Sequence, residues 1–180
     1  MQELPRSRTR KLRTLLPFVV ASYGAAALGS LFTARSLSPW YRGLRKPRWT
    51  PPDRLFGPVW TVLYGMMAVS AWLIRQAVRA SPGHERAGRA ALLSWWLQLL
   101  LNVLWSAIFF GRRSLSGGLA VITPLGAMIA STAFLAARVR PLAGLLLLPY
   151  LAWTGFAAAL NYRIWQLNRR RSLLRRALPG

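Results

Sequence analysis

The chain has 180 residues, of which 54% are hydrophobic, and its formal net charge is +22. This length allows one domain, and so apolar a composition is untypical of a soluble protein. The charge alone would indicate a nucleic-acid partner, but the Lys and Arg residues lie mostly between long apolar runs rather than along one helix face, which argues against nucleic-acid binding. No cysteine is present, and His84 has no acidic cluster beside it, so we predict neither a disulfide nor a metal site.

A basic N-terminal segment, residues 1–14, precedes the first of five apolar segments. Its cations resemble the start of a signal peptide, but the apolar run that follows is about 20 residues long and lacks an A-x-A cleavage site, so we expect a retained span. Each apolar segment is close to the length of about 20 residues that a helix needs to cross the hydrocarbon core. We therefore predict an all-α membrane protein, a five-transmembrane-helix bundle, with spans at residues 15–34, 57–74, 92–110, 115–137 and 142–165.

The first loop, about residues 35–56, differs from an ordinary polar linker. Pro47 and the pair Pro51-Pro52 fix the backbone and force the residues before them into extended geometry, so the loop is stiff and is not one continuous helix. It also carries rings with a polar handle, the type enriched where hydrocarbon meets water: Trp40, Tyr41 and Trp49. Two compatible interpretations remain, an interfacial aromatic belt and a rigid lid over a binding cavity.

Polar and aromatic residues recur at helical spacing in the second, third and fifth spans. The third span places Trp95, Gln98, Asn102, Trp105 and Ser106 on one helix face. Amides in hydrocarbon need partners, so this face either bonds neighbouring helices or lines a cavity. Similar stripes, which more often serve packing, are Trp60, Tyr64, Met67 and Ala71 in the second span and Tyr150, Trp153, Ala157, Leu160 and Asn161 in the fifth. The three stripes together favour a flat aromatic ligand.

Helix bends and close helix contacts are predicted for the remaining spans. Pro124 and Pro149 lie inside the fourth and fifth apolar segments, where each removes a backbone donor and should bend its helix. Small residues at four-residue spacing, such as Ala25 with Gly29, allow helices to approach closely. No internal repeat is evident, which argues against the inverted-repeat transporters.

Five crossings place the two termini on opposite sides of the membrane. The cations are divided almost evenly between the two sides, so the positive-inside rule does not set the orientation, although we favour a cytoplasmic C-terminus. The basic C-terminal tail, residues 169–180, is predicted to fix the topology or to bind anionic lipid.

Four stretches occur in order along the chain: WYRGLRKPRWTPP, FGPVWTVLYG, QLLLNVLWSAIFF and PYLAWTGFAAALNYRIWQLN. Together they resemble the TspO / translocator protein family (TspO/MBR), which includes the tryptophan-rich sensory proteins and the peripheral-type benzodiazepine receptors. The resemblance covers residues 15–168 as one transmembrane domain. It implies a five-helix bundle, often a homodimer, with a pocket facing the first loop that binds porphyrins such as protoporphyrin IX and haem, sterols in some members, and drug ligands.

Transferred by position, the resemblance implies a ligand-binding pocket with no assigned catalytic residue, no metal and no required cofactor. Arg42, Arg45 or Lys46 would pair with the propionates of a porphyrin. The implied pocket residues are Tyr41, Pro51, Phe56, Trp60, Tyr64, Gln98, Asn102, Trp105, Ser106, Trp153, Ala157 and Leu160.

The resemblance leaves several functions open. The leading hypothesis is a membrane receptor or sensor for tetrapyrroles; the alternatives are a light- and oxygen-dependent porphyrin-degrading enzyme acting through Trp60 and Trp153, and a transporter of tetrapyrroles or sterol-like ligands. Arg163 follows Tyr162 directly, so the sterol pattern, which requires residues between the Tyr and the cation, is not met. We expect a multi-pass protein of a bacterial cell membrane, with the outer membrane as the alternative.

Overall fold

The structure is a computed structural model that describes residues 6–36 and 39–177. Within these ranges the chain is helical and contains no strand. The ends of the two predicted basic segments, residues 1–5 and 178–180, lie outside the described residues. The elements are α1 (Arg6–Ser36), α2 (Pro39–Arg42), η1 (Asp53–Leu55), α3 (Phe56–Ala80), η2 (Pro82–His84), α4 (Glu85–Ser106), the π-helical turn η3 (Ala107–Gly111), α5 (Leu115–Val139), α6 (Pro141–Leu145) and α7 (Leu148–Ala177).

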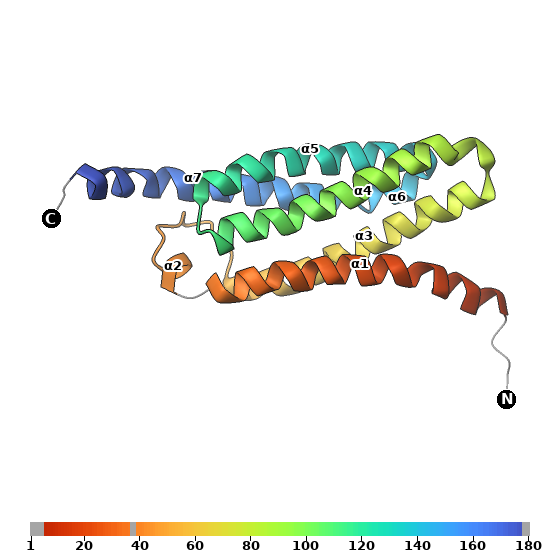
Figure 1. The fold of residues 1–180 in the computed structure, drawn as a ribbon, viewed down its shortest axis with the longest axis horizontal. Helices are drawn as coiled ribbons and strands as arrows, with labels where there is room; N and C mark the ends of the chain where they lie inside the picture. Colours follow the sequence, from red (N-terminus) through yellow and green to blue (C-terminus); the bar gives the residue numbers. More distant parts are fainter. Residues whose placement is uncertain (1–5, 37–38, 178–180) are drawn as a thin grey trace, which may run out of the picture.

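The predicted five-helix bundle is confirmed. The described part of the chain contains five helical segments long and apolar enough to cross a membrane. They lie side by side along a common axis, with α1 beginning at one end of the bundle and α7 ending at the other (Figure 1). The spans are Arg13–Thr33, Asp53–Ala80, Glu85–Gly111, Leu115–Val139 and Pro141–Arg169.

Two predicted boundaries differ from the structure at the turn between α3 and α4. The helices continue beyond residues 57–74 and 92–110, to Ala80 in α3 and back to Glu85 in α4. Hydropathy marks only the part of a helix that lies in hydrocarbon, whereas helix hydrogen bonds continue into the polar ends. Only the short η2 turn separates the two helices.

The fifth span is broken rather than gently bent. Leu146 and Leu147 separate α6 from α7, and Pro149 is the second residue of α7. Proline is well tolerated in the first turn of a helix because the N–H groups there have no partner within the helix. The predicted distortion at Pro149 is therefore a new helix start, whereas Pro124 lies inside the continuous helix α5.

The end of the bundle away from the first loop is solidly packed. Trp95, Met67 and Ile129 are fully buried there, and the Trp95 Nε1–H donates to the Met67 carbonyl oxygen at 3.0 Å. The hydroxyls of Ser94 on α4 and Thr132 on α5 lie 2.7 Å apart. This half therefore forms a packed core, and the cavity described below lies at the end that carries the first loop.

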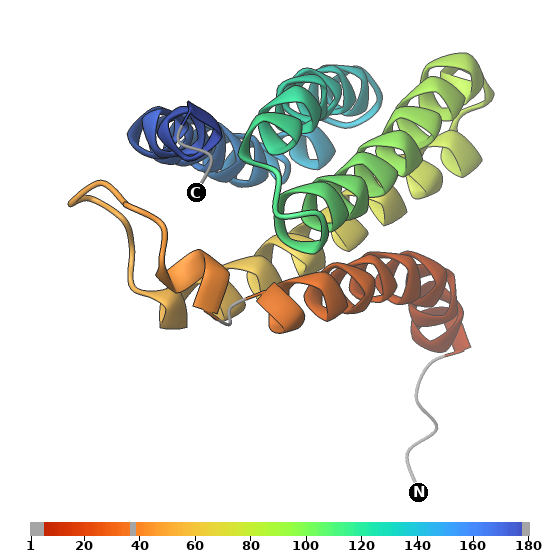
Figure 2. The same cartoon turned by 60° about the vertical axis from the view of Figure 1, so that its left-hand side comes forward.

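A second, smaller core lies beneath the first loop. It consists of Tyr41 from α2, Phe109 from η3, and Leu160 and Ile164 from α7. Figure 2 shows the loop leaving α2, reaching toward α7 and returning to the start of α3. The loop thus lies over the end of the bundle between α2, α7 and the start of α3.

Candidate ligand-binding cavity

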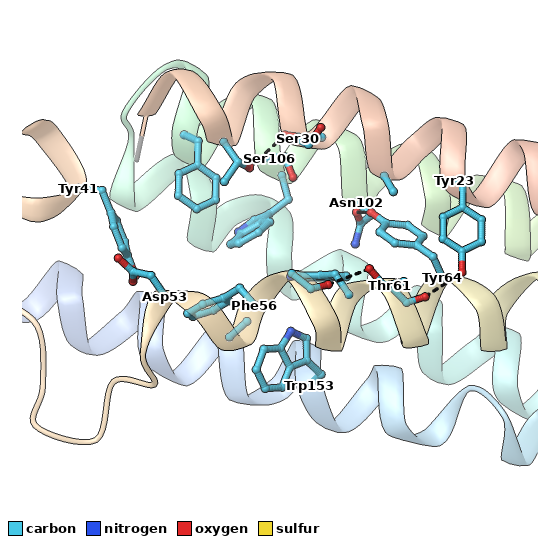
Figure 3. A pocket seen from close by; sticks show the side chains of 18 residues that line it. Tyr23, Ser30, Tyr41, Asp53, Phe56, Thr61, Tyr64, Asn102, Ser106 and Trp153 are labelled. Carbon is cyan, nitrogen blue, oxygen red and sulfur yellow. Dashed lines mark hydrogen bonds between the residues drawn. The ribbon is translucent and has the colours of Figure 1, made fainter. Parts of the chain in front are cut away.

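A cavity of about 390 Å³ lies beneath the lid, between α1, α3, α4 and α7 (Figure 3). Its volume falls in the range of about 300 to 1,000 Å³ typical of small-molecule sites. The walls are mainly apolar and aromatic. The lining residues are Tyr23, Ala26, Gly29, Ser30, Thr33, Tyr41, Asp53, Phe56, Gly57, Trp60, Thr61, Tyr64, Asn102, Trp105, Ser106, Phe110, Trp153 and Ala157.

Aromatic rings of α3 and α7 form one wall of the cavity. The Phe56 and Trp153 ring centroids lie 5.8 Å apart, and those of Trp60 and Tyr150 lie 6.0 Å apart, both edge to face. Trp60 also lies 5.6 Å from Tyr64, one helical turn along α3. Edge-to-face pairs of this kind stabilise one another by about 0.5–1.5 kcal/mol beyond the area that they bury. The wall is therefore a fixed aromatic surface.

The floor of the cavity is fixed by the amide of Asn102. Its Oδ1 accepts a hydrogen bond from the Tyr64 hydroxyl at 2.6 Å, and its Nδ2 donates to the Tyr150 hydroxyl at 2.9 Å. One amide on α4 thus joins α3 to α7. Both interpretations of the polar face of the third span apply to Asn102, since it bonds neighbouring helices and also lines the cavity.

Two indole N–H groups at the cavity have no hydrogen-bond partner. The Nε1 atoms of Trp105 and Trp153 are buried, and no described residue accepts from either. A buried donor without a partner is unfavourable by roughly 1–3 kcal/mol. Both nitrogens have almost no accessible surface, so a ligand acceptor would gain by bonding them once the rings turned toward it. The two rings also supply flat apolar faces. The site can therefore bind a flat ring system that carries hydrogen-bond acceptors.

Tyr41 closes the lid over the cavity. Its ring is 5% exposed and lies 5.9 Å from the Phe110 ring, and the Lys46 Nζ lies 3.8 Å from the Tyr41 centroid on the loop side. Burial, and to a lesser extent the negative charge of Asp53, raises the pKa of Tyr41 from 10.0 to about 12. The phenol is therefore neutral at physiological pH. The Tyr41 ring closes the lid end of the cavity, with its hydroxyl toward the cavity mouth.

The far side of the lid is fastened to α7 by a reciprocal pair of hydrogen bonds. The Arg45 N–H donates to the Asn168 Oδ1 at 3.1 Å, and the Asn168 Nδ2 donates to the Arg45 carbonyl oxygen at 3.0 Å. The same Nδ2 also donates to the Ile164 carbonyl oxygen on its own helix at 2.7 Å. Asn168 therefore fixes the position of the lid relative to α7.

Most of the pocket residues implied by the family resemblance meet at this cavity. Those that line it are Tyr41, Phe56, Trp60, Tyr64, Asn102, Trp105, Ser106, Trp153 and Ala157. Three others lie elsewhere. Pro51 lines a shallow groove on the outer surface beside Trp49, Leu160 packs in the small core behind Tyr41, and Gln98 is buried below the cavity floor.

The position of Gln98 follows from the packing of α4. It lies one turn from Asn102 toward the solid end of the bundle, is 1% exposed, and neither its Oε1 nor its Nε2 has a partner among the described residues. The helical spacing correctly placed Gln98 and Asn102 on one face. It could not show where along that face the cavity ends.

The wall formed by α1 was not predicted. Tyr23, Ala26, Gly29, Ser30 and Thr33 all line the cavity. The signal was present as three hydroxyl side chains, Tyr23, Ser30 and Thr33, on one side of the apolar part of α1, together with the small residues interpreted only as helix-packing positions. Residues near the lid were missed as well: Asp53, Gly57, Thr61 and Phe110.

The cations expected to pair with propionates near the surface lie outside the cavity itself. Arg42, Arg45 and Lys46 do not line the cavity, and Asp53 is the charged side chain among the lining residues. The Lys46 ammonium lies over the outer face of Tyr41 instead. The lid cations can still attract an anion to the surface, but a carboxylate stands at the cavity mouth.

The chain is similar in sequence to a known protein family and to several known proteins. The sequence pattern of the TspO/MBR family matches residues 16–166. The chain is 42% identical to the tryptophan-rich protein TspO of Chlorobaculum tepidum, covering 78% of this chain and 86% of that protein. It is 36% identical to protein CrtK of Rhodobacter capsulatus, covering 84% and 90%. It is also 37% identical to the translocator protein of Bos taurus, covering 91% and 92%.

Proposed function

The chain belongs to the TspO/MBR family, and from that premise we propose that it is a membrane receptor or sensor that binds porphyrins such as protoporphyrin IX or haem. The ligand lies in the cavity beneath the lid and links the protein to tetrapyrrole regulation or transport. The bilayer of a bacterial cell is its proposed location.

The observation that supports this proposal best is the pair of unpartnered indole N–H groups of Trp105 and Trp153 in an aromatic cavity. A porphyrin is flat and apolar over most of its area, which suits stacking against Trp60 and Trp153. Its carboxylates are strong acceptors for the two indole donors. A cavity that was merely a packing gap between helices would need neither the aromatic walls nor the unpartnered indole donors.

Titration of the purified protein in lipid nanodiscs with protoporphyrin IX, in the dark, tests the proposal. Trp153→Phe keeps an aromatic ring but removes the N–H, so its Kd should rise by about two- to tenfold, the equivalent of about 0.5–1.5 kcal/mol. Trp96 is the matched control, because it is 52% exposed on the outer face of α4 and does not line the cavity. Trp96→Phe should leave Kd at the wild-type value; equal effects of both substitutions would contradict the proposal.

An enzymatic function is the second candidate, because Trp60 and Trp153 place two oxidisable indoles in the same cavity. In this case the bound porphyrin would supply the photochemistry and the oxygen chemistry, and the protein would hold it against the indoles. Illumination in air separates the two functions. A new absorbing product that forms in light, and not in Trp60→Phe or Trp153→Phe, favours catalysis, whereas quenching of fluorescence without a product favours binding alone.

A further inference from the structure

The cavity opens sideways on the membrane-spanning surface of the protein. Five of its lining residues are themselves exposed. Asp53 lies at the lid, and the other four lie on α1 and α3: Tyr23, which is 39% exposed, Ser30, Gly57 and Thr61. Tyr23 and Ser30 belong to α1, and Gly57 and Thr61 belong to the part of α3 beside it. We name the gap bounded by these four residues the lateral window. All four lie within helical segments that are long and apolar enough to cross a membrane, which is consistent with a window on the bilayer-facing side of the bundle.

The lateral window exists because the side chains around it are small. A Cβ built at Gly57 would meet no atom within 4 Å, so α3 has free space on this side. On α1 the residues between Tyr23 and Thr33 that face the cavity are Ala26, Gly29 and Ser30. At the other end of the same helix pair, the gap is closed by Thr14, whose Oγ1 accepts from the side chains of Trp72 and Gln76, each at 3.0 Å.

One hydrogen bond crosses the lateral window. The Tyr23 hydroxyl donates to the Thr61 carbonyl oxygen at 3.0 Å, which joins α1 to α3 beneath the opening (Figure 3). Gly65 makes room for this contact, since a Cβ there would lie 3.2 Å from the Tyr23 hydroxyl oxygen. The Tyr23 ring also lies 6.5 Å from the Tyr64 ring, so the hydrogen bond and this ring contact together limit how far α1 and α3 move apart here.

The rim of the lateral window offers little that would stop an apolar ligand. The Thr61 hydroxyl donates to the Gly57 carbonyl oxygen at 2.9 Å, and the Ser30 hydroxyl donates to the Ala27 carbonyl oxygen at 2.7 Å. Both donors are therefore satisfied within their own helices. A hydrocarbon-soluble ring passing between them would leave these two hydrogen bonds intact, so the Tyr23–Thr61 bond is the one that it would meet.

The lid side of the cavity is held by several contacts between the lid and the bundle. Asn168 fastens the lid to α7 through Arg45, and Tyr41 is buried against Phe110. A ligand entering past the lid meets these contacts and the carboxylate of Asp53, whereas one entering between α1 and α3 meets the Tyr23–Thr61 hydrogen bond and the Tyr23–Tyr64 ring contact. We infer that the lateral window between α1 and α3 admits a flat, bilayer-dissolved ligand to the cavity, with the Tyr23–Thr61 hydrogen bond as its latch. This inference rests on the proposed binding of porphyrins.

Stopped-flow mixing of nanodisc-embedded protein with vesicles that contain protoporphyrin IX tests the route, with tryptophan quenching as the signal. Thr61→Phe places a large ring at the window and should lower the association rate constant at least about fivefold. Val62→Phe is the matched control, because Val62 is the next residue of α3, is 60% exposed, and lines neither the cavity nor the window. Its rate constants should equal those of the wild type.

Removing the latch should have the opposite effect. Tyr23→Phe loses the hydrogen bond to Thr61, so association and dissociation should both become faster, by about three- to tenfold for an interhelical bond of this kind. Wild-type association rates in Thr61→Phe, or a change confined to its dissociation rate, would overturn the lateral route while leaving porphyrin binding in place. If the wild-type protein shows no saturable quenching, the proposed function fails, and the lateral route fails with it.

Discussion

Asp53 gives the cavity mouth a negative charge in a chain whose formal charge is +22. Its side chain is exposed, and it lies in the η1 turn directly before α3. A dianionic porphyrin in the cavity would therefore be attracted by the lid cations and repelled by Asp53. We expect Asp53 to influence which end of such a ligand faces the lid.

Replacing Asp53 with Asn should tighten the binding of protoporphyrin IX. The interaction of exposed charges amounts to about 0.2–1 kcal/mol, so Kd should fall by about 1.4- to fivefold at low ionic strength. The difference should shrink as salt is added. Asp53→Glu keeps the charge and should behave as the wild type. Weaker binding by Asp53→Asn would instead mean that the carboxylate accepts a hydrogen bond from the ligand.

The protonation of Tyr41 reports whether the lid is closed. Its pKa is raised from 10.0 to about 12, so the neutral phenol is favoured in the closed lid. The closed state keeps this contribution in full below pH 10 and loses it as the pH rises from about 10 to 12, because an exposed tyrosine ionises first. The tyrosinate absorbance of the wild type minus that of Tyr41→Phe should titrate near pH 12. A midpoint near pH 10 would mean that Tyr41 is solvated and the lid is open.

At the scale of elements, α4 carries two amides on one face with opposite consequences. Asn102 bonds the hydroxyls of Tyr64 and Tyr150, whereas Gln98 is equally buried and bonds no described residue. An amide that joins three helices stabilises the bundle, and one without partners destabilises it. The two positions therefore form an internal comparison within one helix.

Asn102→Leu should lower the free energy of unfolding by about 1–3 kcal/mol, since it leaves two buried hydroxyls without their partner. Gln98→Leu should leave stability unchanged or raise it, because it removes an unsatisfied amide from an apolar core. Thermal denaturation of both variants in the same detergent measures the contrast. A loss of stability in Gln98→Leu as large as that in Asn102→Leu would show that Gln98 is bonded in the membrane.

Much of the element pattern could be predicted from the sequence, because hydrophobic length and helical spacing are local properties. Five spans and the inward stripes of α3, α4 and α7 follow from these properties. These properties do not show which residues of a stripe line the cavity and which pack in the core. Trp60 lines the cavity, whereas Met67 on the same face of α3 is a core residue. Which residues line the cavity depends on where the lid lies. The periodicity of a single helix cannot show a tertiary arrangement of this kind.

At the scale of the whole molecule, the helices are packed tightly at one end and held apart at the other. The lid, α1, α3, α4 and α7 enclose the space that results, and aromatic rings from all four helices line it (Figure 3). The family resemblance indicated most of the wall from sequence motifs. The contribution of α1 and the sideways opening required the packing of the complete bundle.

Determining the structure of the protein with protoporphyrin IX bound in a lipid environment tests the central claim most directly. The macrocycle should lie in the cavity beneath the lid, in contact with the rings of Trp60, Trp105 and Trp153. Density for the porphyrin on the outer surface, for example in the groove beside Trp49 and Phe156, with the cavity unchanged, would contradict that claim.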